Sequence, residues 1–170
     1  MTDTRPATGL IAVYSGSFDP VTRGHIDIVE RTSLLFDEVI VAVGRHPTKQ
    51  GFFPVEERCE LIEASIQHLP NARAAHFSGL VVEFCRQVGA KIIIRGLRAV
   101  GDFEPELKMG MANRNLNDEV KTLFMLPSPE MTFVSSSLVR ELAEFGGDYA
   151  RYVTPPVHEA MKKRYPADPS

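Results

Sequence analysis

The chain has 170 residues, of which 44% are hydrophobic and 24% are charged, and its formal net charge is −3. These values are ordinary for a globular protein, and the length suffices for one domain that buries about two-thirds of its unfolded surface. The acidic balance argues against a broad basic face, so we expect no nucleic-acid partner. No apolar run approaches the ~18 residues of a membrane span, and residues 1–6 lack the apolar core of a signal peptide. We therefore expect no membrane partner and a cytoplasmic location.

Apolar, β-branched runs alternate with helical patterns along the chain. Several runs are almost continuously apolar, which is typical of a parallel sheet covered on both faces. The third run is weak and is expected at an edge of the sheet. The predicted strands lie near residues 10–14, 39–44, 73–77, 91–95 and 121–126.

Helical patterns fill the intervals between these strands. A helix opens with Gly24 after the first strand, and a second begins at Pro54, with apolar residues three and four apart as far as Leu69. A third covers 81–88 and ends at Gly89, where glycine can adopt a left-handed conformation. Further helices are expected at 102–115, at 138–145 after three serines and with Phe145 facing inward, and at about 156–164.

This alternation predicts an α/β fold, namely a doubly wound, Rossmann-like parallel sheet of five strands with helices on both faces. We expect a single domain over residues 1–170, with flexible ends at 1–8 and 165–170. Cys59 and Cys85 fall on apolar faces of predicted helices. We interpret them as two reduced core thiols and expect no metal site in the protein.

The segment after the first strand carries the clearest sign of a ligand site. Residues 15–25 read SGSFDPVTRGH, a turn of small residues that leads into a helix. Such a turn presents backbone N–H groups and a positive helix end at the strand's carboxyl edge, where open α/β sheets bind phosphates. Gly24 allows close approach of a ligand, and His25 places an imidazole where a nucleotide phosphate would lie. The P-loop motif and the G-x-G-x-x-G dinucleotide motif are both absent.

Three other groups of residues follow later strands. Serines 135–137 start a helix and offer donors at its positive end. Arg95 and Arg98 flank a glycine after the fourth strand, and guanidinium groups match phosphate oxygens well. Lys49 lies in the loop after the second strand. Taken singly, a helix cap and solvated side chains would explain these residues, but a parallel sheet brings all of them to one edge. Together they predict a local basic phosphate site.

The chain closely resembles the phosphopantetheine adenylyltransferases of coenzyme A biosynthesis, within the wider nucleotidyltransferase group that shares the T-x-G-H signature. The resemblance runs from about residue 10 to about residue 160. The Gly-His turn marks only the wider group, whereas IRGLRAV at 94–100 and FVSSSLV at 133–139 together point to this activity. The other matching segments are GSFDP at 16–20, GHIDIV at 24–29, FD at 36–37, PTK at 47–49, EER at 56–58, DFE at 102–104 and NR at 113–114.

This resemblance implies transfer of the adenylyl group of ATP to 4′-phosphopantetheine, which gives dephospho-coenzyme A and pyrophosphate. It implies that His25 stabilises the transition state through an α-phosphate oxygen. Glu106 is expected to contact ATP, although Pro105 stands beside it where the family can have an aromatic residue. The implied ATP-binding residues are Ser17, Phe18, His25, Gly96, Leu97, Arg98, Glu106, Met131, Thr132, Phe133, Val134, Ser135, Ser136 and Ser137, and the implied acceptor-binding residues are Ser17, Lys49, Val81 and Arg95.

The resemblance also implies Mg²⁺ bound through the ATP phosphates without a dedicated protein cage, a homohexamer, and feedback binding of coenzyme A. Three alternatives stay open. Another member of the group, such as a cytidylyltransferase or a nicotinamide-nucleotide adenylyltransferase, would differ around Arg95 and the serines. A non-catalytic nucleotide or coenzyme A sensor would have no need of an α-phosphate donor at His25. A fragment of a class I tRNA synthetase fits poorly with the short, acidic chain.

Overall fold

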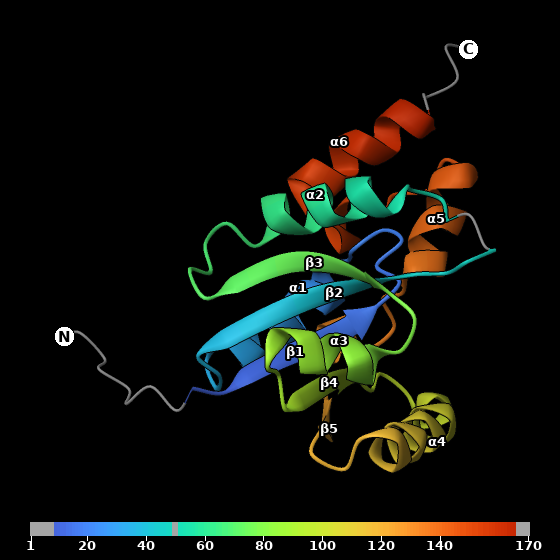
Figure 1. Ribbon diagram of the computed structural model, residues 1–170. Helices are drawn as coiled ribbons and strands as arrows, with labels where there is room; N and C mark the ends of the chain where they lie inside the picture. The colour runs from blue at the N-terminus through green and yellow to red at the C-terminus, as the bar shows by residue number, and fades with distance from the viewer. Residues whose placement is uncertain (1–8, 49–50, 166–170) are drawn as a thin grey trace.

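Five parallel strands form the centre of the molecule, in the order β3-β2-β1-β4-β5 (Figure 1). The computed structural model describes residues 9–48 and 51–165. The chain builds outward from β1 on one side and then crosses over to β4 on the other, so the strand order reverses beside β1. In chain order the strands are β1 (Ile11–Gly16), β2 (Glu38–Arg45), β3 (Ala72–Ser78), β4 (Ile92–Gly96) and β5 (Lys121–Met125). The predicted sheet is confirmed, and β3 lies at an edge as expected.

Helices cover both faces of the sheet, which confirms the predicted fold class. In Figure 1, α2 and α6 lie over one side of the sheet, and α3 and α4 lie on the other. The α-helices are α1 (Arg23–Ser33), α2 (Val55–Ser65), α3 (Val81–Val88), α4 (Val100–Leu116), α5 (Ser136–Glu144) and α6 (Pro155–Arg164), with short 3-10 helices at η1 (Pro129–Met131) and η2 (Ala150–Tyr152). Within the described ranges, no helix is long and apolar enough to cross a membrane.

Successive side chains of each central strand enter opposite cores. On one face, Tyr14 and Ile94 pack with apolar residues of α1, α2, α5 and α6, such as Val29 and Met161. On the other face, Val13 and Ile93 pack with Val82, Phe84 and Cys85 of α3. Burial on both faces explains why the sequences of β1, β2 and β4 are almost continuously apolar.

Two predicted helix features are wrong. Helix α2 ends at Ser65 rather than at Leu69, because Pro70 disfavours helical backbone at the residue before it and cannot donate a helical hydrogen bond. Phe145 is 79% exposed. It follows the last residue of α5, where the Gly147 N–H donates to the Leu142 carbonyl and the helix stops.

Two smaller expectations also need correction. Cys59 is only partly buried, whereas Cys85 lies in the core. The predicted flexible end included Tyr165, but the Tyr165 ring stacks on Phe52 with a centroid distance of 5.4 Å. The remaining predicted flexible residues, 1–8 and 166–170, lie outside the described ranges.

Helix α4 lies beside the edge strand β5 and exposes much apolar surface. Its exposed side chains include Val100, Phe103, Met109 and Met111, and the one buried residue within Val100–Leu116 is Asn113. Most globular helices bury one apolar stripe. Helix α4 instead leaves many of its apolar side chains exposed, because the rest of the chain covers them only in part.

Candidate active site

The turn between β1 and α1 (residues 17–22) has a strained and tightly packed backbone. Phe18 adopts a φ of 45°, a left-handed value that is uncommon for a bulky residue. Its ring is buried and contacts the rings of Tyr14 and His25 edge-on, each with a centroid distance of 5.1 Å. A Cβ on Gly16 would come within 3.0 Å of the Phe18 ring. Glycine at position 16 therefore allows Phe18 to fold back under the turn.

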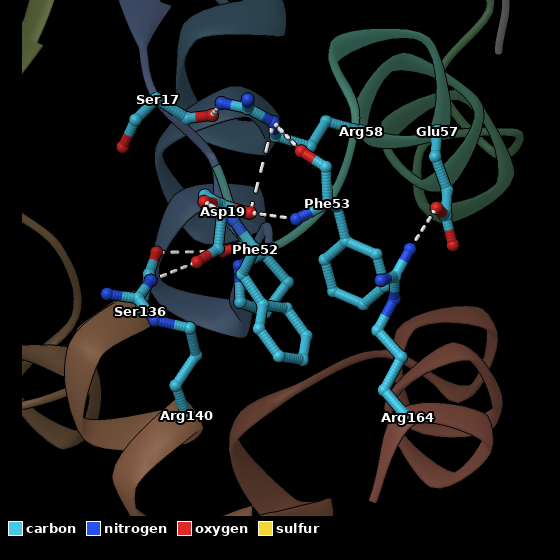
Figure 2. Close-up of polar contacts among 10 residues, drawn as sticks. Ser17, Asp19, Phe52, Phe53, Glu57, Arg58, Ser136, Arg140 and Arg164 are labelled. Carbon is cyan, nitrogen blue, oxygen red and sulfur yellow. Dashed lines mark hydrogen bonds and ion pairs between the residues drawn. The ribbon is translucent and has the colours of Figure 1, made fainter. Parts of the chain in front are cut away.

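Side chains from two helices bind the carbonyl groups of this turn. Arg58 of α2 donates to the Ser17 carbonyl at 2.9 Å. From α5, Arg140 donates to the Asp19 carbonyl and Ser136 donates to the Pro20 carbonyl at 2.8 Å. Figure 2 shows Arg58 approaching from one side of the turn and the two α5 residues from the other. The turn is thus fixed by elements far from it in sequence.

His25 is oriented by the cap of α1. The backbone N–H of Thr22 donates to Nδ1 of His25 at 3.0 Å, and the Thr22 hydroxyl accepts from the His25 N–H. This reciprocal arrangement satisfies donors at the helix start. Because Nδ1 accepts a backbone N–H, the proton of the neutral ring lies on Nε2. The imidazole is therefore a hydrogen-bond donor through Nε2.

The surroundings of His25 keep its ring neutral. Burial and, to a smaller extent, the nearby positive charge of Arg98 together lower its pKa from 6.5 to about 4. The histidine lines a cavity together with Arg98. At neutral pH this side chain can donate a hydrogen bond to an anion without itself carrying a charge.

Arg95 leaves the end of β4 and binds Glu106 of α4 in a two-point ion pair. Its Nε and Nη2 each lie 2.6 Å from a Glu106 carboxylate oxygen. Nη1 donates to the Ser15 carbonyl at 2.5 Å. The sequence interpretation assigned Arg95 to an acceptor and Glu106 to ATP, yet the structure pairs them. Pro105, one residue before Glu106, lies inside the continuous helix α4.

Arg98, which follows β4, is bonded to the segment that precedes α5. Nη1 of Arg98 donates to the Val134 carbonyl at 3.3 Å, and its Nε forms an ion pair with Asp102 at 3.4 Å. Ser135 caps α5 by accepting the Leu138 N–H at 3.1 Å. This end of α5 is positive, which favours an anion near it.

These elements surround a cavity of about 310 Å³ at the carboxyl edge of the sheet, which we call the nucleotide cavity. It lies beside β1 and β4, where the strand order reverses, the usual position of ligand sites in such sheets. The predicted site residues that line it are Ser17, Phe18, His25, Arg95, Gly96, Arg98, Glu106, Val134, Ser135, Ser136 and Ser137.

A second cavity, of about 1120 Å³, opens beside the first, and we call it the acceptor cavity after the role predicted from the sequence for Val81, which lines it. Val81 lines it, as do the apolar side chains of Phe52, Phe77, Leu80 and Met109. Predicted acceptor residue Lys49 lies outside the described residues. The residues that line both cavities are Ser15, Gly16, Ser17 and Arg95.

Four predicted ATP-binding residues do not line either cavity: Leu97, Met131, Thr132 and Phe133. The Leu97 N–H bonds the Met125 carbonyl at the end of the sheet. Phe133 is 58% exposed and packs against Tyr152. The Met131 carbonyl nevertheless lies against the start of α1, since a Cβ on Gly24 would be 3.4 Å from it. Met131 therefore lies next to Gly24, which lines the nucleotide cavity.

Sequence reasoning missed Arg140, Asp19 and Arg58 as parts of this region. Arg140 follows Ser136 by four residues, so both lie on one face of α5, and this spacing was a usable signal. Asp19 and Arg58 lie in the matching segments GSFDP and EER, but the sequence assigned them no role, because their partners are mainly backbone groups of distant segments.

The comparison with protein families settles the class of protein. The model of a family described as cytidylyltransferase-like matches residues 13–142. This range covers most of the chain and includes every predicted site residue. The chain belongs to the cytidylyltransferase-like family.

Membership in this nucleotidyltransferase family supports an enzyme that binds a nucleotide and transfers its nucleotidyl group. A solved structure agrees on the fold. It is of a protein described as a nicotinate-nucleotide adenylyltransferase from Vibrio parahaemolyticus. The two structures superpose with a TM-score of 0.66 over 91% of each chain, at 18% sequence identity. At that identity the likeness concerns the α/β architecture.

Proposed function

We propose that this cytidylyltransferase-like protein transfers the adenylyl group of ATP to 4′-phosphopantetheine, giving dephospho-coenzyme A and pyrophosphate. The observation that carries the proposal is the meeting of the two cavities at Ser17 and Arg95. One cavity offers donors suited to phosphates, and the other, of about 1120 Å³ with a partly apolar lining, has room for a pantetheine arm. The segments at 94–100 and 133–139, which resemble the phosphopantetheine adenylyltransferases, support this choice of acceptor.

The reaction fits the groups available. An oxygen of the acceptor phosphate attacks the α-phosphorus of ATP, a new P–O bond forms, and the bond to the pyrophosphate oxygen breaks. The acceptor phosphate is already ionised near neutral pH, so the step requires no general base. Negative charge builds on the non-bridging α-phosphate oxygens, and a fixed donor stabilises it there. We assign that donor to Nε2–H of His25, which the Thr22 cap orients.

The remaining roles follow from the family resemblance, and the cavity linings support those of Ser17, Val81, Arg95 and Arg98. We propose that Ser17, Phe18, Gly96, Leu97, Arg98 and Glu106 bind ATP with residues 131–137, and that Ser17, Lys49, Val81 and Arg95 bind the acceptor. Mg²⁺ is proposed to enter with the ATP phosphates. Glu106 is the acidic side chain that lines the nucleotide cavity. It is already paired with Arg95, so it does not by itself form a metal-binding site. Within the described residues, no group of three acidic, histidine or cysteine side chains is placed to hold a metal.

We further propose that the chain acts as one domain, in the cytoplasm, as a homohexamer subject to feedback binding of coenzyme A. The exposed apolar side chains of α4 support assembly, since large exposed apolar patches mark interaction surfaces. A second candidate acceptor is a nicotinate or nicotinamide mononucleotide, because the Vibrio parahaemolyticus structure of the same fold is described as a nicotinate-nucleotide adenylyltransferase.

The experiment is pyrophosphate release from ATP with each acceptor in turn: 4′-phosphopantetheine, nicotinate mononucleotide and nicotinamide mononucleotide. Glycerol 3-phosphate with CTP tests the cytidylyltransferase alternative, and His25→Ala is the control for catalysis by this site. Release with phosphopantetheine alone, lost in His25→Ala, supports the proposal. Release only with another acceptor contradicts the proposal and identifies that acceptor as the substrate. Tight binding of nucleotide or coenzyme A without release identifies a sensor.

A further inference from the structure

Arg58 and Asp19 join the β1–α1 turn to the segment that precedes α2. Arg58 is 7% exposed. Besides its bond to the Ser17 carbonyl, it donates through Nε to the Phe53 carbonyl at 2.8 Å. The Asp19 carboxylate accepts the N–H groups of Phe52 at 2.7 Å and Phe53 at 2.8 Å. One arginine and one carboxylate therefore connect two backbone segments that are more than thirty residues apart.

The two side chains also contact each other, with 3.9 Å between Nε of Arg58 and a carboxylate oxygen of Asp19. They leave little space around them. A Cβ on Gly51 would lie 2.5 Å from the Arg58 guanidinium and 2.7 Å from the Asp19 carboxylate. Figure 2 shows Arg58 between Ser17 and Phe53, with Asp19 on the side that faces α5. The pair is thus a buried, closely packed contact between two segments rather than a surface ion pair, and we call Arg58 and Asp19 the junction.

The bond from Arg58 has a consequence for the ligand side of the turn. A trans peptide is planar, and its C=O and the following N–H point in opposite directions. Arg58 fixes the Ser17 carbonyl, and this fixes the direction of the Phe18 N–H. Phe18 holds an uncommon left-handed φ of 45°. A strained turn of this kind persists only where its surroundings determine it.

The other end of the junction lies in the acceptor cavity. Gly51, Phe52 and Arg58 line that cavity, as do Asp19 and Ser17. Phe52 and Phe53 are additionally packed by Arg164 at the end of α6, whose guanidinium lies 4.5 Å from the centroid of the Phe53 ring. Residues 51–53, of which Gly51 and Phe52 form part of the cavity wall, are therefore fixed on one side by α6 and on the other by Asp19 and Arg58.

We propose that Arg58, with Asp19, is a positioning residue that sets the geometry between the two substrates. It orients the Ser17–Phe18 peptide on the nucleotide side and holds residues 51–53 on the acceptor side. This inference rests on the proposed two-substrate function. It assigns to the pair a role beyond that of a buried ion pair that stabilises the fold.

The test compares Arg58→Gln, Arg58→Lys and Asp19→Asn in steady-state kinetics with both substrates. In Arg58→Gln, loss of bonds from a buried charged donor lowers kcat/KM roughly 10–100-fold and affects both substrates. Arg58→Lys keeps the charge but cannot reach both carbonyls, so its activity is intermediate. Asp19→Asn keeps the shape but loses one accepted N–H, while the backbone bond from Arg140 stays. Its KM therefore rises for the acceptor more than for ATP.

Ser65→Ala is the matched control for a purely structural role. Ser65 is also buried on α2, but its hydroxyl bonds Thr154 at 2.6 Å, on the side of α6 and outside both cavities. Its loss lowers the melting temperature and leaves both KM values unchanged. The inference is overturned if Arg58→Gln behaves in the same way, with a lower melting temperature but kinetics within about twofold of wild type at a temperature where both are folded.

Failure of the proposed function can be distinguished from failure of this inference. If the wild-type protein makes no dephospho-coenzyme A, the same variants are compared by calorimetric binding of ATP alone. Weaker ATP binding by Arg58→Gln than by Ser65→Ala then still supports the positioning role at the Ser17–Phe18 peptide. Equal ATP affinity of these two variants overturns it.

Discussion

The two cavities adjoin, yet they are built differently. The nucleotide cavity is small, and its arginines are already engaged: Arg95 with Glu106, Arg98 with the Val134 carbonyl, and Arg140 with the Asp19 carbonyl. The acceptor cavity is several times larger and has a substantial apolar lining, which includes Phe77 and Leu80. Fixed donors suit a chemical step that is the same for every acceptor. A roomy apolar cavity suits selection of one acceptor among several.

The largest effect is expected on the nucleotide side, in His25→Ala. This variant loses the donor proposed for the α-phosphate, so we expect its turnover to fall roughly 10²–10³-fold while ATP binding is kept. Turnover is measured by pyrophosphate release and ATP affinity by calorimetry. Turnover near the wild-type value would remove His25 from the chemistry and place the donor elsewhere in the cavity.

Arg95 lines both cavities, and Arg95→Ala tests the boundary between them. If Arg95 binds the acceptor phosphate as proposed, its loss raises the acceptor KM roughly 10–100-fold, more than it raises the KM for ATP. Arg98→Ala is the matched variant, and the opposite bias is expected there. Equal effects of Arg95→Ala on both KM values would contradict the division into two subsites.

The neutral state of His25 gives a smaller effect that depends on pH. Its pKa is about 4 in the folded chain, compared with 6.5 for an unperturbed histidine. As the pH falls, the unfolded chain therefore binds the proton at a higher pH than the folded chain does. The stability contributed by neutral His25 is present above pH 6.5 and is lost as the pH falls toward 4. His25→Asn lacks this dependence, so the stability difference between wild type and variant shifts by roughly 2 kcal/mol in favour of the variant from pH 7 to 4.5. Urea unfolding at both pH values measures it, and an unchanged difference would contradict a depressed pKa.

The smallest effect is expected for Thr22→Val. The substitution keeps the shape and the backbone bond to Nδ1 but removes the hydroxyl, which accepts the His25 N–H and also lies 3.0 Å from Nδ1. Loss of such a cap destabilises the protein by about 1 kcal/mol. Turnover falls only modestly, because the tautomer of His25 is still fixed by the backbone N–H. Thermal unfolding and turnover are compared with those of His25→Ala, and a loss of turnover as large as in that variant would mean that the hydroxyl itself orients the ring.

Much of the fold follows from local pattern. Continuous apolar runs identified β1, β2 and β4 because both faces of these strands are buried. The convergence of His25, Arg95, Arg98 and the serines was also predictable, because every parallel strand delivers its following residues to one edge. The length of α2 was predicted wrongly because the apolar periodicity continues to Leu69, whereas Pro70 disfavours helical backbone just before it.

The pairing of charged groups was less accessible from sequence. Arg95 and Glu106 both match ligand-binding positions of the resembling family, and nothing in their spacing shows that a strand end and a helix face bring them within 2.6 Å of each other. The contacts of Arg58 were hidden for a different reason. It binds carbonyl groups, which every residue carries, so no side-chain pattern marks its partners. Such contacts depend on the assembled fold.

The ion pair of Arg95 and Glu106 has a consequence for which anions can enter. In the folded protein this guanidinium already has an internal counter-ion, held through two bonds of 2.6 Å. An arriving anion has to compete with a carboxylate that costs no translational entropy to keep in place. Chloride or a free phosphate offers little beyond its own charge for that exchange. A phosphate attached to a longer molecule brings the contacts of the rest of that molecule, so the pair favours large phosphorylated ligands over simple salts.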